Sequence, residues 1–120
     1  MKGNSIIKDK SFLFAISIVN IYKRLVSEKK EFVLSKQLVR SGTSIGANVS
    51  EAVNGQSDKD FIAKLCIARK EAQETLYWLN LLEATLYLTK IEAEQLKLDC
   101  EELLKILTAI IKTVQNKISN

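Results

Sequence analysis

The chain has 120 residues, 47% of them hydrophobic and 27% charged, and its 18 Lys and Arg against 14 Asp and Glu give a net charge of +4. A chain of this length can bury a core of its own, so we expect a single domain over residues 1–120 and exclude a two-lobed enzyme. Because the sequence has no histidine, His-based catalytic triads and histidine metal sites are excluded. We therefore expect no enzyme activity, no metal and no cofactor.

The absence of proline and the presence of only four glycines predict helices joined by short turns. The first helix is expected from about Lys10 to Glu28, with Asp9 or Ser11 as its cap. One apolar stripe of this helix contains Phe12, Ala15, Ile16, Val19 and Val26, and the other contains Phe14, Ile18, Ile21 and Leu25. Since a surface helix of a monomeric bundle needs only one stripe, the second predicts either a subunit contact or a wide core face.

Three further helices follow. The second is expected over residues 34–54, and Asn54-Gly55 is a typical C-terminal stop. Ser57 with Asp60, and Thr89 with Glu92, are capping signals that open the third and fourth helices. The expected core stripes are Leu38, Ile45, Val49 and Ala52; Phe61, Leu65, Ala68, Ala72, Leu76, Leu79, Leu82 and Leu86; and Leu96, Cys100, Leu103, Leu107, Ile110, Val114 and Ile118. Connections of two to six residues make neighbours antiparallel, so the predicted fold is an all-α, up-down-up-down four-helix bundle.

The two cysteines and the N-terminal region indicate a cytoplasmic protein. Cys66 and Cys100 are far apart in the chain, which favours free thiols in a reducing compartment over a disulfide, the minor alternative. Lysines precede the apolar run 12–19 as in a signal peptide, but the run continues into a helical pattern without a small-residue cleavage site. No apolar stretch approaches the roughly 20 residues of a membrane-spanning helix, so no membrane association is expected.

Two glycines lie inside the second predicted helix. Gly42 and Gly46 each cost about 1 kcal/mol relative to alanine in a helix, and their four-residue spacing clears one face for the close approach of another helix. The same segment is not a phosphate-binding loop, because Ala47-Asn48 follows the second glycine in place of Lys-Ser or Lys-Thr.

Polar side chains also align on the second helix. Arg40 and Glu51 share one sector of its surface, with Asn48 at the margin. The antiparallel third helix offers Glu71 and Glu74, so a contact between Arg40 and Glu74, or between Asn48 and Glu71, is expected. Such polar networks between helices more often fix register and assembly than perform chemistry. The aromatic residues late in the third helix are expected in the core or a subunit interface; they are Tyr77, Trp78 and Tyr87.

Basic residues gather in the first third of the chain, where residues 1–40 carry nine basic and three acidic side chains. In the predicted bundle, the end of the first helix and the start of the second meet at one pole. The candidate nucleic-acid-binding residues there are Lys23, Arg24, Lys29, Lys30, Lys36 and Arg40. The acidic start of the fourth helix returns to this pole, and between copies in a ring the two charges could complement each other.

Two stretches make the chain similar to a known family. They are QLVRSGTSIGANVSEA at residues 37–52, and DFIAKL continuing through KEAQET to YWL at residues 60–79. The chain resembles the four-helix-bundle family of proteins encoded in intervening sequences of bacterial 23S ribosomal RNA genes, which includes the accessory variability protein of diversity-generating retroelements. The resemblance implies a ring of protomers, pentameric in characterised relatives, and no enzymatic activity.

The resemblance also implies partners, because the retroelement relatives bind nucleic acid and a reverse transcriptase through a basic surface. The residues that match the family's motifs are Arg40, Asn48, Glu51 and Glu74. The chain departs from many relatives in having Ala52 where they have glycine, and in a lower positive charge. Two functions stay open: an oligomeric RNA- or nucleic-acid-binding accessory protein, and a protein–protein scaffold.

Overall fold

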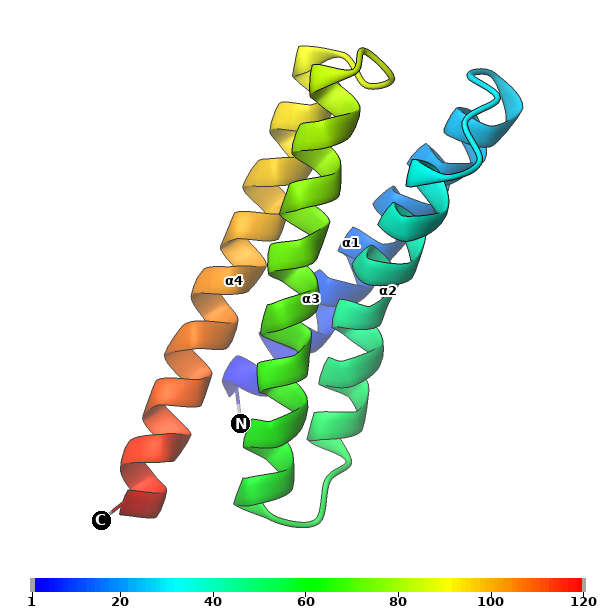
Figure 1. Cartoon of the computed structure of the whole chain (residues 1–120). Helices are drawn as coiled ribbons and strands as arrows, with labels where there is room; N and C mark the ends of the chain where they lie inside the picture. The colour runs from blue at the N-terminus through cyan, green and yellow to red at the C-terminus, as the bar shows by residue number, and fades with distance from the viewer. Residues whose placement is uncertain (1, 120) are drawn as a thin grey trace.

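The computed structural model describes residues 2–119 and contains four helices whose successive members run in opposite directions (Figure 1). The helices are α1 (Lys2–Ser27), α2 (Leu34–Val53), α3 (Asp58–Ala84) and α4 (Lys90–Ser119). The predicted all-α up-down bundle is therefore confirmed. The α1–α2 and α3–α4 turns lie at one end, and the α2–α3 turn lies at the other (Figure 1). Met1 and Asn120, the predicted limits of the domain, lie outside the described residues.

Two of the helix starts form as their sequences predict. The Ser57 hydroxyl accepts the N–H of Asp60 at 3.1 Å and begins α3. At the start of α4, the N–H of Glu92 donates to the Thr89 hydroxyl at 3.2 Å, and the N–H of Thr89 donates to the Glu92 carboxylate at 2.9 Å. This reciprocal arrangement is a capping box, which satisfies N–H groups that the helix itself leaves without acceptors.

The start predicted for α1 was wrong. This helix begins at Lys2 and not near Lys10, and Ser11 is buried within it, with its hydroxyl donating to the Lys8 carbonyl at 3.1 Å. The additional turns place Ile7 in the core, where it is 1% exposed. Burial of this side chain extends the apolar stripe of α1 by two turns, and such packing outweighs a local capping preference.

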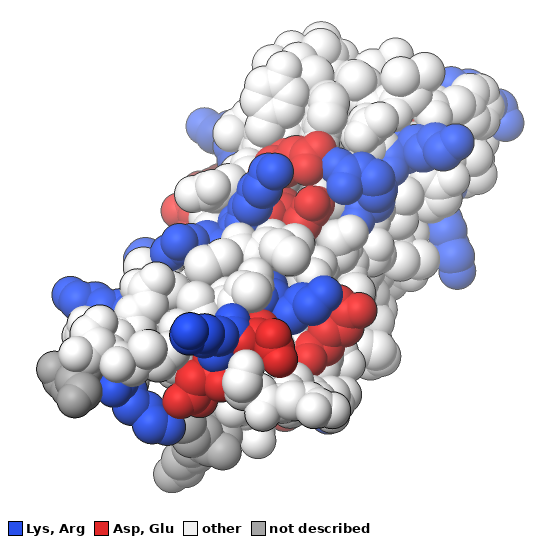
Figure 2. Space-filling model, turned by 60° about the horizontal axis from the view of Figure 1, so that its bottom comes forward, with Lys and Arg blue, Asp and Glu red and all other residues white. Residues whose placement is uncertain are grey.

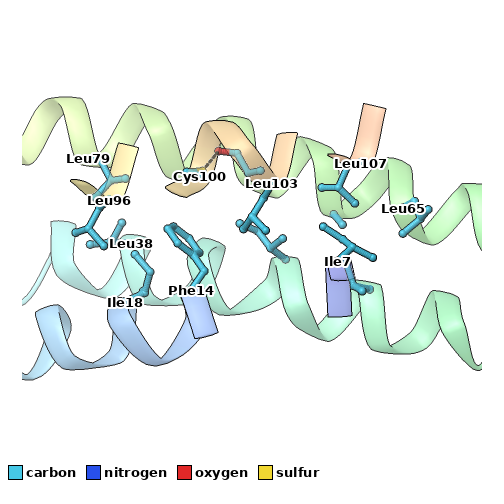
Figure 3. Close-up of a cluster of buried hydrophobic side chains, with 14 of the residues drawn as sticks. Ile7, Phe14, Ile18, Leu38, Leu65, Leu79, Leu96, Cys100, Leu103 and Leu107 are labelled. Carbon is cyan, nitrogen blue, oxygen red and sulfur yellow. Dashed lines mark hydrogen bonds between the residues drawn. The ribbon is translucent and has the colours of Figure 1, made fainter. Parts of the chain in front are cut away.

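One continuous core receives side chains from all four helices (Figure 3). Figure 3 shows Phe14 and Ile18 of α1 facing side chains of α3 and α4. Most of the expected stripe residues of α2, α3 and α4 are buried or packed against this core, and Leu86 and Ile118 are exposed exceptions. Leu86 lies beyond the end of α3 in a left-handed conformation (φ 69°), which removes it from the helical period, and Leu88 is buried in its place.

The helix-two glycines lie where α1 and α2 approach each other, as predicted. A Cβ atom on Gly42 would lie 2.8 Å from Ile18 Cγ2, and one on Gly46 would lie 3.3 Å from the Ser11 carbonyl oxygen. No residue larger than glycine fits at position 42 without movement of Ile18. The two glycines therefore set the separation of α1 and α2.

The α1–α2 turn is held by a residue that sequence reasoning missed. The carboxylate of Glu31 is buried and accepts the backbone N–H groups of Val33, Leu34 and Ser35, the bond from Ser35 being 3.0 Å long. The N–H of Glu31 in turn donates to the Leu25 carbonyl of α1 at 3.0 Å. A negative charge at a helix N-terminus that accepts several N–H groups stabilises that helix.

Candidate functional site

The α1–α2 end carries the six basic residues that the sequence singled out. Lys23 and Arg24 lie in the last turns of α1, Lys29 and Lys30 in the turn, and Lys36 and Arg40 in the first turns of α2. The short connection between two antiparallel helices brings these side chains to one end of the bundle. The two arginines form ion pairs within the chain, whereas the four lysines form none among the described residues.

Arg24 is not free for a ligand, because it forms an ion pair with Glu92 at the start of α4. Burial alone would raise the pKa of Glu92, but hydrogen bonds with Thr89 and the charge of Arg24 lower it below its ordinary value. The acidic start of α4 thus neutralises one of the six cations within the same chain. This contact fixes the end of α1 against α4.

Arg40 is held in the same way by α3. Its guanidinium donates to Glu71 at 3.2 Å and also to Glu74, and the indole N–H of Trp78 donates to Glu74 at 3.3 Å. The hydrogen bond from Arg40 lowers the pKa of Glu74 in spite of partial burial, and the same bond raises the pKa of Arg40. The predicted contact between Arg40 and Glu74 is therefore present, with Glu71 and Trp78 as further members.

Asn48 was wrongly assigned to a contact between α2 and α3, whereas Glu51 does contact α3, but at Lys64 and apart from Arg40. The Asn48 amide donates to the Ser44 carbonyl at 2.8 Å within its own helix, and Glu51 forms a 3.3 Å ion pair with Lys64. Because α2 and α3 are antiparallel, the three turns of α2 from Arg40 to Glu51 lie beside the three turns of α3 that run back from Glu74 to Lys64. Asn48 therefore lies too far along α2 to meet Glu71.

The other four cations are exposed lysines, which we call the basic end: Lys23, Lys29, Lys30 and Lys36. Among the described residues, none of the four lies in an ion pair. The nearby Glu31 carboxylate is buried and faces the backbone of α2. In Figure 2, acidic and basic side chains alternate over the nearer part of one face, whereas blue atoms without red neighbours lie towards its upper right.

Beside the basic end, the turn exposes two apolar side chains that sequence reasoning did not select. Phe32 is 57% exposed and Val33 is 72% exposed. The only signal for them in the sequence is their position between Lys29-Lys30 and Lys36 in a turn. Helical periodicity gives no information on turn residues, so this pair required the structure.

A second exposed feature lies along α1 and α2. Phe12 is 65% exposed and Ile16 is also exposed, so the apolar stripe of α1 that contains these two residues is not part of the core. With Ala15, Phe12 lines one side of a groove of about 520 Å³, and small residues of α2 line the other side. These are Thr43, Gly46, Ala47 and Ser50. We call the surface formed by Phe12, Ala15 and Ile16 of α1 and by these four residues of α2 the α1–α2 face.

Because the sequence has no histidine, the cysteine and carboxylate side chains are the candidate metal ligands. Among residues 2–119, no group of three or more Cys, Asp or Glu side chains is placed to hold a metal ion. Both thiols are free. Cys100 is buried, donates to the Ala72 carbonyl at 3.2 Å (dashed line in Figure 3), and has a pKa raised by burial to about 12. Such a thiol is a poor nucleophile. None of the described helices has an apolar segment long enough to cross a bilayer.

Comparisons with known proteins agree with this architecture. A crystal structure of a protein with unknown function from the S23 ribosomal protein family of Bacteroides thetaiotaomicron VPI-5482 superposes with a TM-score of 0.90. Its sequence is 56% identical, and the match covers 92% of this chain and 98% of that chain. Among curated proteins, none matches. Residues 3–109 match the family described as 23S rRNA-intervening sequence protein, and the chain therefore belongs to that family.

Proposed function

We propose that the protein is a non-enzymatic, oligomeric accessory protein that binds RNA or another nucleic acid through its basic end. The observation that carries this proposal is that the six predicted basic residues differ in whether they have a carboxylate partner. Arg24 and Arg40 are used in ion pairs, whereas the four lysines of the basic end are exposed without carboxylate partners among the described residues. Unpaired surface cations bind phosphates through the release of counterions.

Assembly would multiply this charge. The α1–α2 face exposes Ile16 and also Phe12, which lines a groove opposite small residues of α2, and a second copy of the chain would cover both side chains. In the pentamer that the sequence resemblance implies, five copies at +4 each would carry +20. Binding by such a ring would depend steeply on salt. The free thiols fit a reducing compartment such as the cytoplasm.

The test compares two pairs of charge reversals. Lys29→Glu/Lys30→Glu changes the basic end, and Lys105→Glu/Lys112→Glu makes the same change of charge on exposed positions of α4. We expect the first pair to weaken binding of a structured RNA and to flatten the plot of log affinity against log salt, with little effect from the second. Equal effects of the two pairs would show that only net charge matters, and no effect would remove the basic end from the proposal.

A protein–protein scaffold is the second candidate, and the exposed α1–α2 face favours it. In that case the face would bind a protein partner, such as a reverse transcriptase, and not another copy of the chain. Light scattering separates these possibilities, because a homo-oligomer has its full mass without any partner. An oligomer that binds no RNA at low salt would make the scaffold the better proposal.

A further inference from the structure

We propose that Phe32 is a stacking platform for an unpaired base, so that the basic end prefers single-stranded or looped RNA to a continuous duplex. This inference rests on the proposed function and names its substrate class. It starts from an exposed aromatic ring, 57% accessible, at the centre of a turn with Lys29 and Lys30 on one side and Lys36 on the other. Exposed aromatic rings among cations are the typical means of binding unpaired bases.

The turn is built to hold this ring outward. Glu31 points inward, where its buried carboxylate accepts N–H groups of Val33, Leu34 and Ser35. The Ser35 hydroxyl also donates to the Glu31 carbonyl at 2.7 Å, and the Glu31 N–H donates to Leu25 at 3.0 Å. The residue directly before Phe32 is thus fixed on both sides. A ring on a fixed backbone loses little conformational freedom when it binds.

Position 30 of the turn carries a lysine although its backbone conformation favours glycine. Lys30 has φ 53°, a left-handed conformation in which glycine is free of the steric cost borne by other residues. A lysine there supplies a cation two residues before Phe32 at a small cost in stability. A phosphate next to the stacked base is the partner that such a cation fits.

Phe32 could instead insert into another apolar environment, such as an anionic membrane or a protein surface. The two kinds of contact differ in what they require of the side chain. Stacking on a base requires a flat π surface, whereas apolar insertion accepts any side chain of similar size and would also use Val33, which is 72% exposed. Substitutions that keep the apolar character but remove the ring therefore distinguish them.

The experiment measures the affinity of the full chain for a 12-nucleotide single-stranded RNA and for its duplex. Phe32→Leu is the test variant, Phe32→Tyr keeps the ring, and Val33→Ala removes the neighbouring apolar side chain. We expect Phe32→Leu to weaken single-strand binding at least about fivefold and to leave duplex binding unchanged. Phe32→Tyr and Val33→Ala should both bind the single strand as the wild type does. Melting temperature and solution mass, measured for each variant, should not change because Phe32 is exposed.

Several results would overturn the proposal. They are unchanged single-strand binding by Phe32→Leu, an equal loss on single strand and duplex, a loss of solution mass, or binding to anionic vesicles that Phe32→Leu preserves and Val33→Ala weakens. If Lys29→Glu/Lys30→Glu weakens RNA binding while Phe32→Leu does not, the stacking platform fails and the proposed function stands. If neither the wild type nor any variant binds RNA at low salt, both fail.

Discussion

Ile18 Cγ2 lies 2.8 Å from the position that a Cβ atom on Gly42 would occupy, and Ile18 is fully buried. Gly42→Ala therefore adds a methyl group where the neighbouring side chain has no room to move. We expect the free energy of unfolding to fall by about 1–3 kcal/mol, because overpacking outweighs the better helix propensity of alanine.

Gly46→Ala is the matched control for this substitution. Its Cβ would lie 3.3 Å from the Ser11 carbonyl, a tighter approach than usual but without the overlap found at Gly42. We expect a free energy of unfolding within about 1 kcal/mol of the wild type, as the gain in helix propensity offsets the small adjustment. Urea unfolding of both variants measures the difference. Equal stability of the two would contradict the conclusion that Gly42 is the more tightly packed of the two glycines.

Contacts between residues close together in the sequence could be predicted better than contacts between two helices. The capping pair Thr89 and Glu92 was predicted because both partners lie within one turn of helix. The contact of Arg40 with Glu74 was predicted from the face that each occupies on its helix. Asn48 was wrongly joined to Glu71, because helical periodicity gives the face of a residue but not the register between two helices.

Two features at the α1–α2 end of the bundle could not be predicted for a similar reason. Arg24 belonged to the predicted binding residues, but its pairing with Glu92 depends on how α1 docks on α4. Glu31 lies outside the usual capping pattern, since it reaches forward from the turn to three N–H groups of α2. Both depend on the packed bundle. The cluster of cations was visible in the sequence, while the free lysines became distinct only in the structure.

Substitution of Glu31 should test whether its carboxylate orders the turn. Glu31→Ala removes the acceptor of the half-buried Leu34 N–H and of the buried Ser35 N–H, and we expect a loss of about 1–2 kcal/mol in the free energy of unfolding. Hydrogen exchange should become faster at these amides before it changes in the rest of α2. Unchanged exchange at Leu34 and Ser35 would show that water replaces the carboxylate without cost.

The hydrogen-bonded group of Arg40, Glu71, Glu74 and Trp78, which we call the Arg40 cluster, predicts that stability depends on pH. The hydrogen bond from Arg40 lowers the pKa of Glu74 in the folded chain, so the unfolded chain binds a proton more readily at this group. The resulting stability is present above the ordinary carboxyl pKa and is lost as the pH falls through the lowered value. Arg40→Gln should flatten this acid-side loss, with a small effect, below about 1 kcal/mol, at neutral pH because the pair is partly exposed.

Chemical unfolding of the wild type and Arg40→Gln at a series of pH values below 6 measures this difference. Lys64→Gln is the control, since its ion pair with Glu51 is also exposed but neither residue belongs to the cluster. If Arg40→Gln and the wild type lose stability in parallel as the pH falls, the Arg40 cluster does not account for the acid sensitivity.

Glycine substitutions at Lys30 and at Leu86 distinguish an effect on RNA binding from an effect on stability. Both adopt left-handed backbone conformations, with φ 53° and φ 69°. Replacement of either by glycine removes a steric cost, so Lys30→Gly and Leu86→Gly should each keep the free energy of unfolding or raise it by up to about 1 kcal/mol. Only Lys30→Gly removes a cation from the basic end, so only it should weaken RNA binding and reduce the salt slope by about 1. Equal RNA affinity of the two variants, measured at one salt concentration, would mean that the lysine at position 30 does not contact a phosphate.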